Sequence, residues 1–151
     1  MLNSQGLIES YSTLNEEEKI HFLRSFDQQL DITLVAFLLT IVTDRENDDD
    51  LRIEAVNILG LYQGNYNDEY IKEQLIKIIA AHDYEDDSLV VYCINTLSLL
   101  TVSDKEIDFA VNIIRSNSYI LFKAAALELL RQHKYHPKAI EALKDLDKGT
   151  H

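Results

Sequence analysis

Apolar residues recur every three or four positions along almost the whole chain. This spacing puts them on one face of a helix, whereas a half-buried strand would alternate at every second residue. The pattern predicts nine helices with short connections, and short connections favour antiparallel packing of neighbouring helices. The expected helices are residues 3–12, 15–29, 31–43, 50–62, 68–82, 87–101, 104–115, 118–133 and 137–147.

Polar residues at the expected helix starts support these assignments. Asn15 and Asp31 each precede a helical pattern, where a side-chain oxygen can cap the first N–H groups of the helix. Pro137 fits a first helical position, with His136 before it as the capping residue. The stretch 31–43 is apolar on nearly every side, so we expect it to be the most buried helix. Its β-branched residues leave a strand as the alternative.

Several of these helices repeat one another. Residues 50–62 align with 87–101 at an offset of 38, and with 118–133 after a further 32. The intervening helices 68–82 and 104–115 align at an offset of 36. A period of 32–38 residues with two helices per unit is typical of an α-solenoid, in which helix pairs stack. The aligned positions are Leu51, Ala55, Leu59 and Leu61; Leu89, Cys93, Leu97 and Leu99; and Leu121, Ala125, Leu129 and Arg131.

The stretch DLRIEAVNILG, residues 50–60, carries the repeat in its clearest form. An apolar residue and an arginine follow the first aspartate, and a small residue and a leucine come next at helical spacing. This motif resembles a HEAT-like repeat, and the resemblance covers about residues 50–147. The later units depart from it at two positions, where Val90 and Phe122 replace Arg52, and Ser98 and Leu130 replace Gly60.

The resemblance implies an all-α fold. It would be a short right-handed α-solenoid of about four antiparallel helix pairs, forming a single domain over residues 1–151. A non-repetitive helical bundle is the alternative. In HEAT-like arrays the second helix of each unit usually lines the concave face, so the resemblance points to polar residues on two helices as partner-binding candidates. The units would be residues 13–43, 49–82, 86–115 and 118–147, and the candidates are Glu69, Lys72, Glu73, Lys77, Lys105 and Asp108.

Composition agrees with a helical protein of the cytoplasm. Glycine (4) and proline (1) are too scarce for the many turns of a β-sandwich or barrel. The single cysteine cannot form a disulfide framework. The first residues lack the basic and apolar regions of a signal peptide, and the longest apolar run, 34–42, is shorter than the roughly 20 residues that cross a bilayer. We therefore expect a soluble cytoplasmic protein.

The negative charge is concentrated in the first two thirds of the chain. The net charge is −12; residues 1–100 hold 19 acids and 6 bases, and residues 101–151 hold 7 acids and 8 bases. An anionic body repels the phosphates of nucleic acids and of anionic membranes, which counts against both as partners. The same charge attracts a basic protein.

The repeat predicts where this charge gathers. The connections 44–49 and 83–86 both join one unit to the next, so they are expected at the same edge of the array. Arg45 and Arg52 are the only bases expected nearby. We call the resulting set the acidic ridge: Asp44, Glu46, Asp48, Asp49, Asp50, Asp83, Glu85, Asp86 and Asp87.

Three interpretations of the acidic ridge remain open: solvated turns, a docking face for a basic partner, and cation binding. Asp49 or Asp50, and Asp86 or Asp87, can be explained as helix N-caps. A calcium-binding EF-hand loop that starts at Asp44 is excluded. Asp49 stands where that loop needs glycine, and Ala55 stands where it needs glutamate.

Some residues that are not members of the acidic ridge are also candidates for binding or chemistry. Tyr66 and Tyr84 fall in connections and are candidate interface anchors, because tyrosine offers a large contact area at low entropic cost. His133 and His136 lack the further ligands that a zinc site needs. Cys93 aligns with alanines, so we expect a buried small side chain rather than a nucleophile.

The sequence contains no phosphate-binding glycine loop, no GxSxG elbow and no HExxH motif, so we expect no catalytic, metal or cofactor site. The expected function is a non-enzymatic protein-binding module for a basic partner. An acidic helical protein of this kind resembles bacterial immunity proteins, which would imply inhibition of a basic nuclease toxin. The alternatives are a general HEAT-repeat scaffold or adaptor, and an enzyme that resembles a HEAT-like DNA glycosylase or a bilin lyase.

Overall fold

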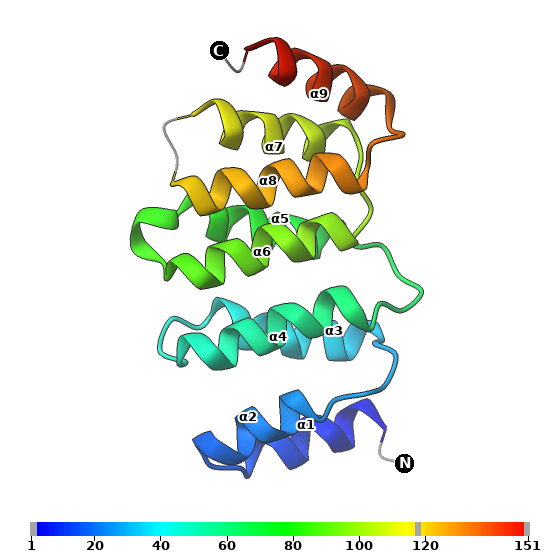
Figure 1. Cartoon of the computed structure of the whole chain (residues 1–151). Helices are drawn as coiled ribbons and strands as arrows, with labels where there is room; N and C mark the ends of the chain where they lie inside the picture. The colour runs from blue at the N-terminus through cyan, green and yellow to red at the C-terminus, as the bar shows by residue number, and fades with distance from the viewer. Residues whose placement is uncertain (1–2, 117–118, 150–151) are drawn as a thin grey trace. The chain divides into compact units, whose positions relative to one another are not determined.

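Nine α-helices make up most of the chain in the computed structural model, which describes residues 3–116 and 119–149. A short 3₁₀ turn, η1 (His82–Tyr84), is the other regular element, and these ranges contain no strand. The all-α prediction is therefore confirmed. The helices, shown in Figure 1, are α1 (Ser4–Ser12), α2 (Glu16–Arg24), α3 (Ile32–Thr43), α4 (Asp49–Leu61), α5 (Glu69–Ala80), α6 (Asp87–Leu99), α7 (Asp104–Arg115), α8 (Ile120–Gln132) and α9 (Pro137–Gly149).

The helices form two compact units, Met1–Cys93 and Ile94–His151, and the boundary falls inside α6. In the first unit, α3 packs against α1, α4 and α5, and α2 packs against α4. In the second unit, α7, α8 and α9 all pack against one another. Three of these pairs, α3 with α4, α7 with α8 and α8 with α9, are neighbours in the chain, as the short connections predict, and the other four skip one helix. The right-handed solenoid arrangement and the single domain of four helix pairs stay predictions.

Several helix starts follow from local sequence. The Asn15 side chain accepts a hydrogen bond from the Glu18 N–H (2.8 Å), and the Glu18 carboxylate accepts one from the Asn15 N–H (3.0 Å). This reciprocal capping box fixes the start of α2. Asp31 caps α3 by accepting from the Leu34 N–H at 2.9 Å. Both predicted caps are confirmed, and the apolar segment after Asp31 is a helix rather than a strand.

The predicted end of the second helix, residue 29, is wrong. Helix α2 ends at Arg24, and Phe26 and Leu30 are buried from an irregular segment instead. The Leu30 N–H donates to the Tyr62 carbonyl (2.9 Å), and the Phe26 ring meets the Tyr62 ring edge-on at a centroid distance of 5.6 Å. These contacts with the end of α4 replace the hydrogen bonds that a longer helix would have made.

The repeat alignment predicts burial with one exception. The first three aligned positions are buried in all three helices, apart from Leu121, which is 50% exposed. The fourth aligned position is exposed each time, as Leu61, Leu99 and Arg131. An arginine is therefore tolerated there because that side of the helix faces solvent. The predicted first residue of the eighth helix, 118, lies outside the described residues.

Gly64 lies where two backbone segments of the first unit come very close to each other. A β-carbon added to Gly64 would lie 1.8 Å from the Leu30 carbonyl oxygen, closer than any nonbonded contact permits. The same Leu30 residue donates its N–H to Tyr62. The backbone between α2 and α3 is therefore held against the backbone that follows α4, and only glycine allows this approach.

We predict that Gly64→Ala lowers the free energy of unfolding by about 1–3 kcal/mol, because the β-carbon must push apart two backbone segments. Urea unfolding followed by circular dichroism measures the change. Gly6→Ala is the matched control, since Gly6 lies inside α1, where alanine forms helix better than glycine. The prediction fails if both substitutions leave stability unchanged or raise it.

Candidate protein-binding surface

The two acidic connections lie beside each other in the first unit. Figure 1 shows the turn between α3 and α4 and the turn around η1 on the same side of this unit. Arg45 from the first turn pairs with Glu85 from the second, with Nε 3.0 Å from Oε1. Arg52, in the first turn of α4, donates from Nη2 to Glu85 Oε2 at 2.7 Å. The predicted proximity of the two connections is therefore confirmed within this unit.

Arg52 is an interior residue with only 3% of its surface exposed. Its Nε donates to the Val42 carbonyl at the end of α3 (2.7 Å), and Asp49 lies 3.8 Å from Nη1. The residues that replace it in the repeat alignment, Val90 and Phe122, are also buried. A guanidinium at a buried position requires an anion and hydrogen-bond acceptors close by, and Glu85 and Val42 supply them.

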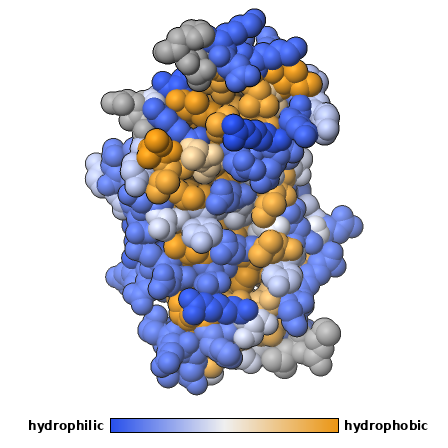
Figure 2. Space-filling view, in the orientation of Figure 1, coloured by the Kyte–Doolittle hydropathy of each residue, from blue (hydrophilic) through white to orange (hydrophobic). Residues whose placement is uncertain are grey.

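Glu85 is not a surface carboxylate, which corrects its predicted place on the ridge. Its side chain is 2% exposed and lies between the two arginines. The other eight members are exposed, and Figure 2 shows a mainly hydrophilic surface over the turns that carry them. The acidic ridge thus consists of one buried carboxylate, Glu85, and eight exposed ones. The exposed members are Asp44, Glu46, Asp48, Asp49, Asp50, Asp83, Asp86 and Asp87.

Two exposed members have local structural roles. Asp86 caps α6 by accepting from the Leu89 N–H at 3.1 Å, as predicted. Asp44 accepts from the Glu46 N–H at 3.0 Å and closes the turn after α3. The predicted cap at Asp49 or Asp50 is wrong, because Asp48 occupies the N-cap position of α4 and its side chain makes no capping hydrogen bond. Asp49 and Asp50 lie instead in the first turn of the helix.

The pKa of Asp49 reflects how close the two acidic turns lie to each other. Partial burial raises the pKa of the Asp49 carboxyl above its ordinary value, and the Asp86 carboxylate raises it further, while Arg52 opposes the shift. A carboxyl whose pKa is higher in the folded chain than in the unfolded chain weakens folding once it ionises. This unfavourable contribution is present above the folded pKa, and it disappears as the pH falls below the ordinary pKa. The charge on Asp49 therefore opposes folding at neutral pH.

The residues predicted on the second helices lie in different environments. Lys72 is fully buried and pairs with Glu69 (2.8 Å), so its predicted place on a surface is wrong. The exposed Glu73 lies 3.9 Å from Lys77. In the second unit, the exposed Asp108 accepts from Lys138 Nζ at 2.6 and 2.7 Å, and this hydrogen bonding raises the pKa of Lys138.

The two candidate tyrosines also differ. Tyr84 is 80% exposed within η1, next to the acidic ridge. Tyr66 is half-buried, and burial raises the pKa of its phenol above the ordinary value. Tyr84 thus offers its ring to a partner, whereas the hydroxyl of Tyr66 is in the interior.

His133 and His136 make hydrogen-bond contacts with the backbone, and Cys93 lies in the core. His136 Nδ1 accepts from the Lys138 N–H at 3.2 Å, which confirms it as the cap before Pro137. His133 Nε2 lies 2.8 Å from the Ser98 carbonyl. Cys93 is completely buried, and burial raises the pKa of its thiol to about 12. Within residues 3–116 and 119–149, no group of three or more His, Cys, Asp or Glu residues is arranged to hold a metal ion.

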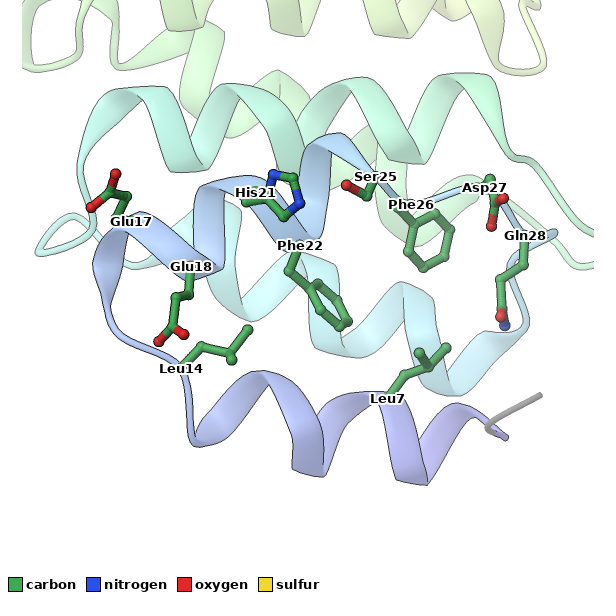
Figure 3. A pocket seen from close by; sticks show the side chains of 10 residues that line it. All are labelled: Leu7, Leu14, Glu17, Glu18, His21, Phe22, Ser25, Phe26, Asp27 and Gln28. Atoms are coloured by element: carbon green, nitrogen blue, oxygen red, sulfur yellow. The ribbon is translucent and has the colours of Figure 1, made fainter.

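Sequence reasoning missed an apolar groove in the first unit. The groove has a volume of about 680 Å³ and lies between α1 and α2. Figure 3 shows Phe22 and Phe26 pointing into it toward Leu7 and Leu14. The apolar period of the sequence does not show that α1 packs on α3 and leaves a face of α2 partly uncovered.

Comparison with known proteins finds no matching family model, no similar curated protein and no similar solved structure. None of the helices in the described part of the chain is both long enough and apolar enough to span a bilayer.

We predict that Glu85→Gln lowers the free energy of unfolding by about 3 kcal/mol, because it removes the buried carboxylate that pairs with Arg52 and leaves only the exposed Asp49, 3.8 Å away, to balance the guanidinium. Arg45→Gln is the control and costs less than about 1 kcal/mol, since the Arg45 side chain is 61% exposed. Chemical denaturation measures both changes. The double variant Arg52→Val with Glu85→Gln recovers most of the loss, because it removes both buried charges. Equal losses for the two single variants would contradict this assignment.

We also predict that the Cys93 thiol does not react with a disulfide reagent in the folded protein at pH 8. The reactive species is the thiolate, and a pKa of about 12 leaves very little of it, in a position without solvent access. Absorbance of the released thiolate follows the reaction, which should go to completion in denaturant. Rapid labelling under native conditions would show that the core around α6 opens readily.

Proposed function

We propose that this protein is a non-enzymatic protein-binding module whose acidic ridge docks a basic protein. The observation that carries the proposal is the gathering of eight exposed carboxylates on two turns that the Arg52–Glu85 pair holds together. The local charge is strongly one-sided, because both nearby arginines are already engaged by Glu85.

Folding alone does not account for this charge. Asp86 caps a helix and Asp44 closes a turn, and acids in the first turn of α4 gain from the helix dipole. The ionised Asp49 nevertheless opposes folding, because burial and its acidic neighbours raise its pKa. A cationic partner would offset the part of this shift that comes from the neighbouring carboxylates.

The mechanism is electrostatic steering followed by short-range contacts. Clustered carboxylates attract a cationic surface and speed its association, and salt screens that attraction. Tyr84, which projects from the second acidic turn, supplies contact area once the partner is aligned. The proposal therefore implies fast association, strong salt dependence and an aromatic contact beside the charges.

Inhibition of a nuclease toxin is the specific form of this function that we favour. A nuclease cleft is basic because it binds phosphates, and a row of carboxylates can occupy the same positions as those phosphates. The ridge would then block the cleft without any chemical step. A HEAT-like glycosylase needs a basic face for its nucleic-acid substrate, and the charge of the ridge is the opposite.

We predict that a four-charge ridge variant, Asp48→Asn, Asp49→Asn, Asp83→Asn and Asp87→Asn, binds the physiological partner at least about tenfold more weakly at low salt. The cap at Asp86 is left intact, so the helix start is preserved. Partners captured on the wild-type chain are identified by mass spectrometry, and the affinity of the purified pair is measured at several salt concentrations.

The control variant removes four exposed acids elsewhere, Glu9→Gln, Glu128→Gln, Glu141→Gln and Asp145→Asn. It has the same net charge as the ridge variant and should keep nearly all of the affinity. Equal binding by the ridge variant and the wild type at low salt would refute the proposal. Equal loss in both variants would show that net charge matters rather than this surface.

A further inference from the structure

A second surface feature adjoins the acidic ridge. The groove between α1 and α2 has an apolar floor, formed by Leu7, Leu14, Phe22 and Phe26. Leu7, Leu14 and Phe22 are half-buried, so part of this floor is open to solvent in the isolated chain. A concave apolar surface of this volume is typical of a binding site.

The rim of the groove is acidic. Figure 3 shows Glu17 and Glu18 at one end of the apolar floor and Asp27 at the other. Glu18 belongs to the capping box of α2, but Glu17 and Asp27 are exposed and make no ion pair or hydrogen bond with the described residues. The described residues that line the groove include no lysine or arginine. An occupant that combines apolar side chains with positive charges is therefore complementary to it.

The groove is continuous with the acidic ridge. A second depression, of about 440 Å³, shares Glu17 and His21 with the groove and extends to Asp48 and Asp50 of the ridge. Arg24, which also lines this depression, is paired with Glu54 at 3.0 Å. The carboxylates of the ridge and the apolar floor thus belong to one connected surface of the first unit.

The floor of the groove favours a helical occupant. The backbone N–H and C=O groups of an extended peptide would lie against Leu7, Leu14, Phe22 and Phe26, whose side chains offer no hydrogen-bond partners. Among the described residues no strand edge is present for an added strand to pair with. A helix satisfies its own backbone and can insert apolar residues at positions i, i+3, i+4 and i+7.

We propose that the groove between α1 and α2 binds a basic amphipathic helix of the partner protein, with its apolar face on Phe22 and Leu14 and its cations against Glu17 and Asp27. This inference rests on the proposed function and names the element of the basic partner that is recognised. The remaining cations of the partner would lie toward Asp48 and Asp50.

The test uses the full chain and a fluorescent peptide of leucine and lysine, about 18 residues long so that a helix can form. Its leucines are spaced for one helical face. Two controls are a peptide of the same composition with alternating order, and a peptide with glutamate in place of lysine. Fluorescence anisotropy should show binding of the amphipathic basic peptide, weaker binding of the alternating one and no binding of the acidic one.

Two variant pairs locate the site. The rim variant Glu17→Gln with Asp27→Asn should weaken binding roughly threefold to tenfold, whereas Asp83→Asn with Asp87→Asn, equal in charge, should change it less than about twofold. The floor variant Leu14→Gln should weaken binding about tenfold or more. Its control is Ile32→Gln, because Ile32 is 63% exposed and does not line the groove. Thermal unfolding confirms that each variant is folded.

The inference is overturned if the rim and floor variants bind the peptide as well as their controls, or if the acidic peptide binds equally well. It is also overturned if sedimentation shows a dimer of this chain that Leu14→Gln abolishes and the peptide does not dissociate, since a second copy would then occupy the groove. If the groove variants keep the peptide but the ridge variant loses its captured partner, only the groove assignment fails. If the groove variants lose the peptide but the ridge variant keeps the partner, only the proposed role of the ridge fails.

Discussion

The buried pair of Arg52 and Glu85 is the interaction on which the rest of the first unit depends. Arg52 joins three segments: it belongs to α4, donates to the last turn of α3 through Val42, and binds Glu85 in the turn before α6. A buried charge is unfavourable by itself, so the arrangement is stable only when all three segments are in place. The same requirement sets the positions of the two acidic turns. The carboxylates that repel one another are held together by an ion pair beneath them.

The first unit thus combines two surfaces with different physical character. The ridge offers exposed charge, which acts over about 8 Å at physiological salt and requires little shape complementarity. The groove between α1 and α2 offers shape and apolar area, which act only on contact. In the function proposed above, long-range attraction would bring a partner close and the apolar contact would hold it. A connected surface that has both properties is better suited to selective protein binding than either part alone.

Most helix starts were predictable from sequence, whereas most contacts between distant segments were not. Asn15, Asp31 and His136 cap the helices that follow them, because a cap involves only a few neighbouring residues. The end of α2 was predicted wrongly, because Phe26 and Leu30 keep the helical period while their actual partners lie near Tyr62. The repeat predicted that the acidic turns adjoin. It gave no sign that Glu85 would be buried, although the alignment of Arg52 with Val90 and Phe122 contained the clue that this arginine lies inside.

The buried arginine also limits how helix α4 could be duplicated or exchanged with the other helices of the repeat alignment. At the position of Arg52, α6 and α8 carry Val90 and Phe122, which need no partner of opposite charge. Helix α4 is therefore not an interchangeable module, because its stability depends on a glutamate 33 residues further along the chain. A longer or rearranged chain could duplicate α6 or α8, which carry apolar residues at this position. To duplicate α4, it would have to copy the turn that carries Glu85 as well, so the effective building block of this protein extends from α4 to the start of α6.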